Sequence, residues 1–239
     1  MGDAIIKDVV MKTVGIIGGL GPETTAEFYL AINFGCYKKN RINRPPVLIW
    51  NVPLRYQVEK DLLTKATGEG RYIPYLTDAA KRLEDGGADF IVMPCNSLHM
   101  FIDEIRRSVK IPVLSILEET SLFLKKKGIK KVGVLATSSL LKKKLYEGYL
   151  QQNGIEQILP DDLDQEKLGR MISNLVMNRY DNRDRQRLLE IINKFADKDV
   201  KEVILACTDL QLLLPHHDKL HIYDTMKIFA DATVDHILE

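Results

Sequence analysis

Short apolar segments alternate with amphipathic segments along almost the whole chain, and this alternation constrains the fold more than any other feature. The apolar segments predict strands over residues 13–17, 46–51, 89–93, 112–115, 132–135, 203–206 and 221–223. The amphipathic segments predict helices over residues 23–37, 72–85, 97–109, 118–127, 140–152, 165–178, 183–196 and 224–238. Continuous apolar strands separated by helices are typical of parallel sheets that are covered on both faces. We therefore predict a doubly wound α/β protein.

The two halves of the chain resemble each other. Residues 12–17 are similar to residues 131–135, and residues 90–97 are similar to residues 202–209, with nearly the same spacing. Such similarity arises either from two like domains or by chance between buried strands. We predict two similar domains, one formed by residues 11–112 and 219–239 and the other by residues 113–218, preceded by an N-terminal extension at residues 1–10.

Composition and charge exclude several classes of protein. The 239 residues include 34 Lys and Arg against 33 Asp and Glu, a net charge of +1. The chain therefore lacks the basic excess of a general nucleic-acid or acidic-membrane binder. Its apolar runs are far shorter than the ~18 residues that a membrane span needs. The first ten residues mix charges and lack the apolar region of a secretory signal, so we expect a cytoplasmic protein with no nucleic-acid or membrane partner.

Three cysteines, Cys36, Cys95 and Cys207, are the residues most suited to carry chemistry. Their odd number argues against a disulfide framework. The chain also has no closely spaced His and Cys residues of the kind that would predict a metal site. Cys36 lies inside an expected helix and is interpreted as a core residue. Cys95 and Cys207 each end an apolar strand and precede an expected helix, which is where an open parallel sheet binds ligands. A thiolate near a helix N-terminus is expected to have a lowered pKa.

Two opposed thiols suit the inversion of a stereocentre. One group removes a proton from one face of a carbon atom, and the other returns a proton to the opposite face. Either cysteine alone is as readily explained by burial in a core, since free cysteine is among the most buried residue types. Their matched positions in two similar halves favour a shared function.

Four segments carry a resemblance to a known family: GIIGGLGPETT (15–25), MPCNSLH (93–99), ACTDL (206–210) and DTMKIFA (224–230). In order and spacing they resemble the aspartate/glutamate racemase family over essentially the whole chain from Met11. The resemblance implies two flavodoxin-like three-layer domains with parallel sheets, an active-site cleft between them, a homodimer, and racemisation of an amino acid without a cofactor or metal. It also implies that Cys95 and Cys207 are the catalytic pair.

The same resemblance implies a set of residues around the substrate. Asn96, Ser97 and Thr208 would bind the α-carboxylate together with nearby backbone N–H groups, and we place Leu98 with them. Asp209, which follows this set, stands where the family more often has glutamate. Other departures are Ala206, Ser97 and Phe229, where glycine, threonine and histidine are more usual. These departures leave the acid–base pair intact and bear on substrate and rate.

The residue that recognises the substrate side chain is less evident. Aspartate-specific relatives look as though they hold the distal carboxylate with basic residues. Arg55 and Lys60 are candidates after the second strand, and Arg179 is a candidate close to the apolar Met177. An aspartate substrate needs such a cation in the cleft, because an unpaired charge there is costly. We assign Arg55 as the substrate-binding cation.

Two alternative functions keep the same fold. One is a related two-cysteine enzyme of the hydantoin racemase or maleate isomerase type, in which one cysteine acts as a nucleophile. The other is a non-catalytic protein that binds a small acid. His99, four residues after Cys95, either tunes the thiol or serves as a packed or capping residue.

Overall fold

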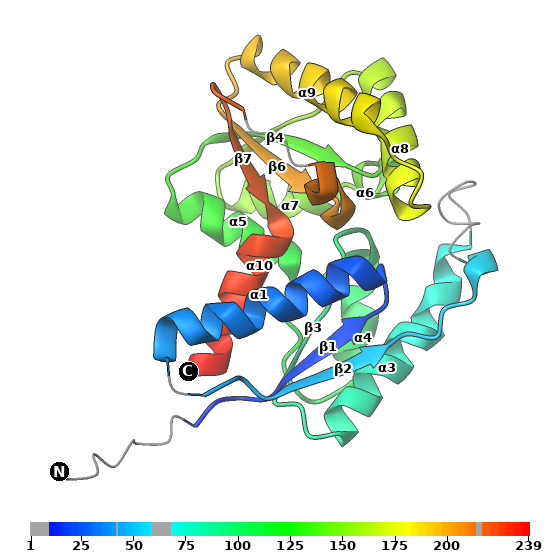
Figure 1. Ribbon diagram of the computed structural model, residues 1–239, viewed down its shortest axis with the longest axis vertical. Coiled ribbons are helices and arrows are strands. Elements are labelled where there is room, and N and C mark those ends of the chain that lie inside the picture. The colour runs from blue at the N-terminus through cyan, green and yellow to red at the C-terminus, as the bar shows by residue number, and fades with distance from the viewer. Residues whose placement is uncertain (1–9, 42, 59–67, 214–216) are drawn as a thin grey trace, which may run out of the picture.

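The computed structural model describes residues 10–41, 43–58, 68–213 and 217–239. The chain forms two α/β lobes, each built on a parallel sheet with helices on its faces (Figure 1). The predicted α/β class with parallel sheets is confirmed. The expected N-terminal extension lies almost wholly outside the described residues, and Lys60 lies outside them too.

The first lobe contains a three-stranded sheet in the order β2-β1-β3, and every pair is parallel. Its strands are β1 (Val14–Gly18), β2 (Val47–Asn51) and β3 (Phe90–Val92). Its helices are α1 (Pro22–Asn40), α3 (Ile73–Asp85) and α4 (Ile102–Ser108). Val113 forms a single parallel bridge to Ile91. The strand predicted over 112–115 is thus reduced to one residue pair beside β3.

The second lobe contains a four-stranded parallel sheet in the order β5-β4-β6-β7. Its strands are β4 (Lys131–Ala136), β5 (Glu156–Ile158), β6 (Glu202–Ala206) and β7 (His221–Asp224). The helices of this half are α5 (Ile116–Lys126), α6 (Ser138–Lys142), α7 (Leu145–Gln152), α8 (Asp162–Val176), α9 (Asn182–Ala196) and α10 (Thr225–Leu238). Two features differ from the prediction. The edge strand β5 is too polar to be recognised from its sequence, and the helix expected over 140–152 is split at Lys144, whose φ is 55°.

The two sheets repeat one strand order. In each lobe the first strand is central, the second lies on one side and the third on the other. A fourth segment then follows the third strand, Val113 in the first lobe and β7 in the second. Residues 221–224 therefore pair within the second sheet, whereas our prediction from the sequence assigned residues 219–239 to the first domain. The helix that follows them, α10, packs against α1 of the first lobe and α5.

One buried hydrophobic cluster joins the two lobes. It combines side chains of β1, β3 and α1 with side chains of β4, β6, α7 and α10. Phe28 of α1 and Phe229 of α10 meet at its centre, with ring centroids 5.6 Å apart. Figure 1 shows α10, in red, running from the second lobe to the first and crossing α1, in blue. Two further clusters lie within the separate lobes, one in each.

Within the described part of the chain, no helix has both the length and the apolar character that crossing a membrane requires.

A methyl group on the central strand β1 should destabilise the protein. A Cβ at Gly15 would lie 2.9 Å from the Cβ of Ala88 and 3.1 Å from the Cβ of Leu83, and neither atom can rotate away. We expect Gly15→Ala to lower the free energy of unfolding by about 1–3 kcal/mol, measured by urea denaturation. Gly148→Ala on helix α7 is the control, because its Cβ would meet nothing within 4 Å. That control should be neutral or more stable by up to about 1 kcal/mol. A Gly15→Ala protein as stable as the wild type would contradict the close packing at β1.

Candidate active site

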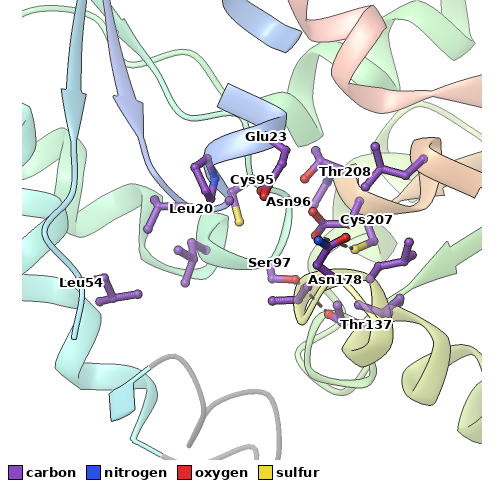
Figure 2. Close-up of a pocket in the computed structure, with 18 of the residues that line it drawn as sticks. Leu20, Glu23, Leu54, Cys95, Asn96, Ser97, Thr137, Asn178, Cys207 and Thr208 are labelled. Carbon is purple, nitrogen blue, oxygen red and sulfur yellow. Dashed lines mark hydrogen bonds between the residues drawn. The ribbon is translucent and has the colours of Figure 1, made fainter. Parts of the chain in front are cut away.

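A cavity of ≈ 310 Å³ lies between the lobes, at the carboxyl ends of their strands. Its walls come from the loops after β1 and β2, Tyr72, the segments after β3, β4 and β6, and the end of α8 with the loop that follows it. Six residues predicted for the site line this one cavity: Cys95, Asn96, Ser97, Leu98, Cys207 and Thr208. Figure 2 shows Cys95 on the side of the first lobe and Cys207 on the side of the second, with the open space of the cavity between them.

His99 fixes the backbone that carries Cys95. Its Nδ1–H donates to the carbonyl oxygen of Cys95 at 2.7 Å, and its Nε2 accepts from the N–H of Ile116 at 3.1 Å. Complete burial lowers the pKa of His99 to about 4, so the ring is neutral, as one donor and one acceptor require. Of the two roles considered for His99, the capping and packing role matches these contacts. The imidazole ties the loop after β3 to the start of α5.

Asn96 is fully buried, and both ends of its side chain are used within the protein. Its Nδ2 donates to Thr225 Oγ1 at 3.0 Å, and its Oδ1 accepts from the hydroxyl of Tyr146 at 2.7 Å. Tyr146 in turn lies 3.4 Å from Thr120 Oγ1. These contacts link the first lobe to α7 and α10. The carboxylate-binding role predicted for Asn96 remains a prediction, and the observed contacts make it a positioning residue.

Ser97 contacts the second lobe directly. It forms a 2.9 Å hydrogen bond with Thr137, the residue that follows β4 and caps helix α6 through Leu140 N–H. Thr137 is a cavity residue that sequence reasoning did not single out. Thr137 lies in the polar loop after the first strand of the second half, and this position could have predicted that it lines the cavity. Ser97 and Thr137 therefore bring one hydroxyl from each lobe to the same wall.

Cys207 lies in a less polar setting than the sequence predicted. It is 6% exposed and follows β6 directly, before a 3-10 segment, η3 (Thr208–Leu213). Burial raises its pKa well above the usual value of a thiol, and the carboxylate of Asp209 raises it further. The prediction of a lowered pKa is wrong for Cys207, because η3 is a short 3-10 turn and burial outweighs its N–H groups. A negative charge on Cys95 also raises the pKa of Cys207, so the two thiols interact electrostatically.

The carboxylate of Asp209 contacts the thiol of Cys207. The thiol donates to Asp209 Oδ2 at 3.8 Å, and Thr24 Oγ1 donates to Asp209 Oδ1 at 3.4 Å. Burial raises the pKa of Asp209 above its usual range. Thr24 belongs to α1, so this carboxylate connects the cysteine of the second lobe to the first helix of the chain. The sequence marked Asp209 only as a departure from the family pattern.

The predicted recognition of a side-chain carboxylate finds no support in this geometry. Arg55 is exposed and is not among the cavity residues, although its neighbours Leu54 and Tyr56 are. Arg179 is likewise exposed, between the lining residues Asn178 and Tyr180. Cys36, by contrast, is wholly buried in α1, as predicted.

The described residues contain no group of three His, Cys, Asp or Glu side chains placed to hold a metal ion.

Comparisons with known proteins agree with the two-lobed α/β fold. A model of the family described as Asp/Glu/hydantoin racemase matches residues 17–233. The broad specificity amino-acid racemase RacX of Bacillus subtilis is 29% identical over 233 residues, 92% of this chain and 96% of that protein. A Yersinia pestis structure, provisionally assigned as an Asp/Glu racemase, superposes with a TM-score of 0.84 at 29% identity, covering 96% of this chain and 100% of that one. An aspartate racemase homologue from Pyrococcus horikoshii gives a TM-score of 0.77 at 26% identity, covering 96% and 100%.

The three thiols should react with iodoacetamide in a fixed order. Cys95 is half-buried and lines the cavity, Cys207 is buried with a raised pKa, and Cys36 is inside the core with a pKa raised by burial to about 11. Because the thiolate is the reactive form, we expect Cys95 to be modified first at about pH 8 and Cys36 last. Asp209→Asn should increase the rate at Cys207, because it removes a negative charge that raises that pKa. Peptide mapping by mass spectrometry measures all three rates. Faster modification of Cys207 than of Cys95 would contradict the description of Cys207 as the more buried and less acidic thiol.

Removal of the Tyr146 hydroxyl should weaken the contact between the lobes. Tyr146→Phe leaves the buried Asn96 Oδ1 without its donor, so we expect the free energy of unfolding to fall by about 1–3 kcal/mol. Tyr37→Phe on α1 is the matched control, since Tyr37 is 65% exposed; its effect should stay within about 0.5 kcal/mol. Equal effects of the two substitutions in urea denaturation would show that the hydrogen bond between Tyr146 and Asn96 does not stabilise the folded protein.

Proposed function

The chain belongs to the Asp/Glu/hydantoin racemase family, and on that basis we propose that it interconverts the two enantiomers of an amino acid without a cofactor. One of Cys95 and Cys207 removes the proton from the α-carbon, and the other gives a proton to its opposite face. The observation that supports this most directly is that both thiols line one cavity from opposite lobes. Each thiol follows the third strand of its sheet. The repeated fold thus supplies the acid and the base from equivalent positions.

In one direction, the thiolate of one cysteine takes the α-proton. The C–H bond breaks, an S–H bond forms, and the electron pair remains on the substrate as a planar carbanion conjugated with its carboxylate. The thiol on the other side then gives its proton to the opposite face, which leaves a thiolate there. The reverse direction exchanges the two roles, so the protein returns to its starting protonation state after one forward and one reverse turnover.

Burial gives Cys207 a specific part in this scheme. A thiol whose pKa is raised holds its proton in the resting state, and its thiolate is a stronger base once it has formed. Asp209 accepts the hydrogen bond of this thiol and has a raised pKa itself. We propose that Asp209 is a positioning residue: it accepts the Cys207 proton in a hydrogen bond within the cavity lining, and its negative charge disfavours the Cys207 thiolate, which makes that thiolate a stronger base.

Developing charge on the substrate carboxylate also needs stabilisation. Ser97 and Thr208 line the cavity, one on each lobe, and each offers a hydroxyl. We propose that these hydroxyls, with the backbone N–H groups after each cysteine, bind the α-carboxylate and take up the charge of the intermediate. Leu98 contributes through its backbone N–H. The role predicted for Arg55 has no part in this proposal, because Arg55 is exposed and outside the cavity lining. The cytoplasmic location and the homodimer remain predictions.

Substitution of either thiol tests this function. Cys95→Ser and Cys207→Ser should each lower racemisation by at least about 100-fold, because a serine hydroxyl is a far weaker acid and base than a thiol. Cys36→Ala, which changes a core cysteine outside the cavity, should retain activity. The measurement incubates single enantiomers in heavy water, and follows α-proton loss by NMR and optical purity by chiral chromatography.

Several results would contradict the proposal. Full racemisation by either serine variant would exclude the two-base mechanism. Lack of α-proton exchange with every amino acid would leave only a binding role. A stable adduct on one cysteine would favour nucleophilic chemistry of the hydantoin racemase or maleate isomerase type.

A further inference from the structure

The cavity walls carry information about the substrate side chain. We infer that the protein acts on amino acids with uncharged, apolar side chains, such as methionine and leucine, and selects against aspartate and glutamate. This inference rests on the proposed racemase function and adds the class of substrate to it.

Apolar side chains from both lobes form much of the cavity wall. On α8, Ile172, Leu175 and Val176 have the spacing that places three residues on one helix face, and all three line the cavity. The first lobe contributes Leu20, Leu54, Tyr56, Tyr72 and Leu98, and η3 contributes Leu212. Figure 2 shows Leu20 and Leu54 on the first-lobe side, extending away from Cys95. A side chain placed there exchanges water for hydrocarbon contact.

The charged residues among the described lining are Glu23 and Asp209, and both are carboxylates. They flank the loop after β1: a Cβ at Gly21 would lie 3.6 Å from Glu23 Oε2 and 3.7 Å from Asp209 Oδ1. Asp209 is also bonded to Cys207, so this negative charge lies at the thiol end of the cavity. Every free amino acid carries a positive α-ammonium group next to the carbon that reacts, and these two carboxylates match that group.

The same charges disfavour an acidic side chain. A second substrate carboxylate would leave water for an apolar wall, and both charged residues of the described lining carry the same sign as that carboxylate. Among the residues that the structure describes, no lysine or arginine lines the cavity to neutralise that carboxylate. Arg55 and Arg179 are both exposed and lie outside the lining. A charge buried without a partner is strongly unfavourable. An apolar side chain of similar length carries no such cost.

A comparison of near-isosteric substrates tests the inference. The wild-type protein is given methionine and glutamate, and leucine and aspartate, and kcat/KM is measured from α-proton exchange in heavy water. We expect methionine and leucine to exceed their acidic counterparts by at least about 100-fold. A kcat/KM for aspartate or glutamate equal to or above that for methionine would overturn the inference and leave the racemase function standing. Lack of exchange with every amino acid would instead contradict the racemase function itself.

Substitution in the α8 wall provides a second test. Val176 lines the cavity and is half-buried, so Val176→Lys adds a cation where the side chain is expected to lie. It should raise the ratio of glutamate to methionine kcat/KM by at least about 10-fold, whereas the uncharged Val176→Met should leave that ratio near the wild-type value. A ratio that is the same in both variants would show that α8 does not contact the substrate side chain. The apolar wall would then have no part in specificity.

The carboxylate pair is tested through KM. Glu23→Gln should raise the KM for methionine about 10-fold, because it weakens the contact with the α-ammonium group. Glu27→Gln is the matched control, because Glu27, like Glu23, is an exposed glutamate of α1, but it binds Gln211 and does not line the cavity; this substitution should leave KM unchanged. A KM for Glu23→Gln equal to that of the control would contradict the assignment of Glu23.

Discussion

The hydrophobic cluster shared by the two lobes determines where every chemical group of the cavity lies. Phe28 and Phe229 pack at its centre, and strands of both sheets contribute to it. Because all strands of a parallel sheet end at the same edge, fixing the two sheets against each other also fixes two rows of strand ends. Cys95 and Cys207 follow strands in these rows, and the cavity separates them. The opposed thiols are therefore a consequence of core packing.

Polar contacts across this junction then set the finer geometry. Asn96 is held between Thr225 and Tyr146, Ser97 is bonded to Thr137, and His99 ties the backbone of Cys95 to α5. Buried polar groups that are fully bonded rigidify their surroundings, whereas one lost partner leaves a costly unpaired group. The segment after β3 is thus restrained on both sides of Cys95, as a catalytic thiol would require.

Much of the fold and part of the site follow from sequence pattern alone. Apolar runs such as residues 132–135 and amphipathic runs such as residues 183–196 predict β4 and α9 closely. The polar edge strand β5 and the break at Lys144 could not be predicted, because sheet pairing and local packing override weak local preferences there. Because both cysteines follow strands, the sequence predicted that they line one cavity, and they do. The raised pKa of Cys207 depends on its burial and on its contact with Asp209, and neither can be read from the sequence. The exposure of Arg55 outside the cavity depends in the same way on the loop that carries it.

In the proposed reaction two thiols, each with a single transferable proton, act on opposite faces of one carbon. The most direct test is the position of deuterium at low conversion in heavy water, starting from one enantiomer and separating the two enantiomers before mass spectrometry. Proton transfer by two thiols predicts deuterium at the α-carbon of the newly formed enantiomer and retained hydrogen in the remaining starting enantiomer, because the first thiol returns the same proton that it removed. Equal deuterium in both enantiomers at early times would contradict it.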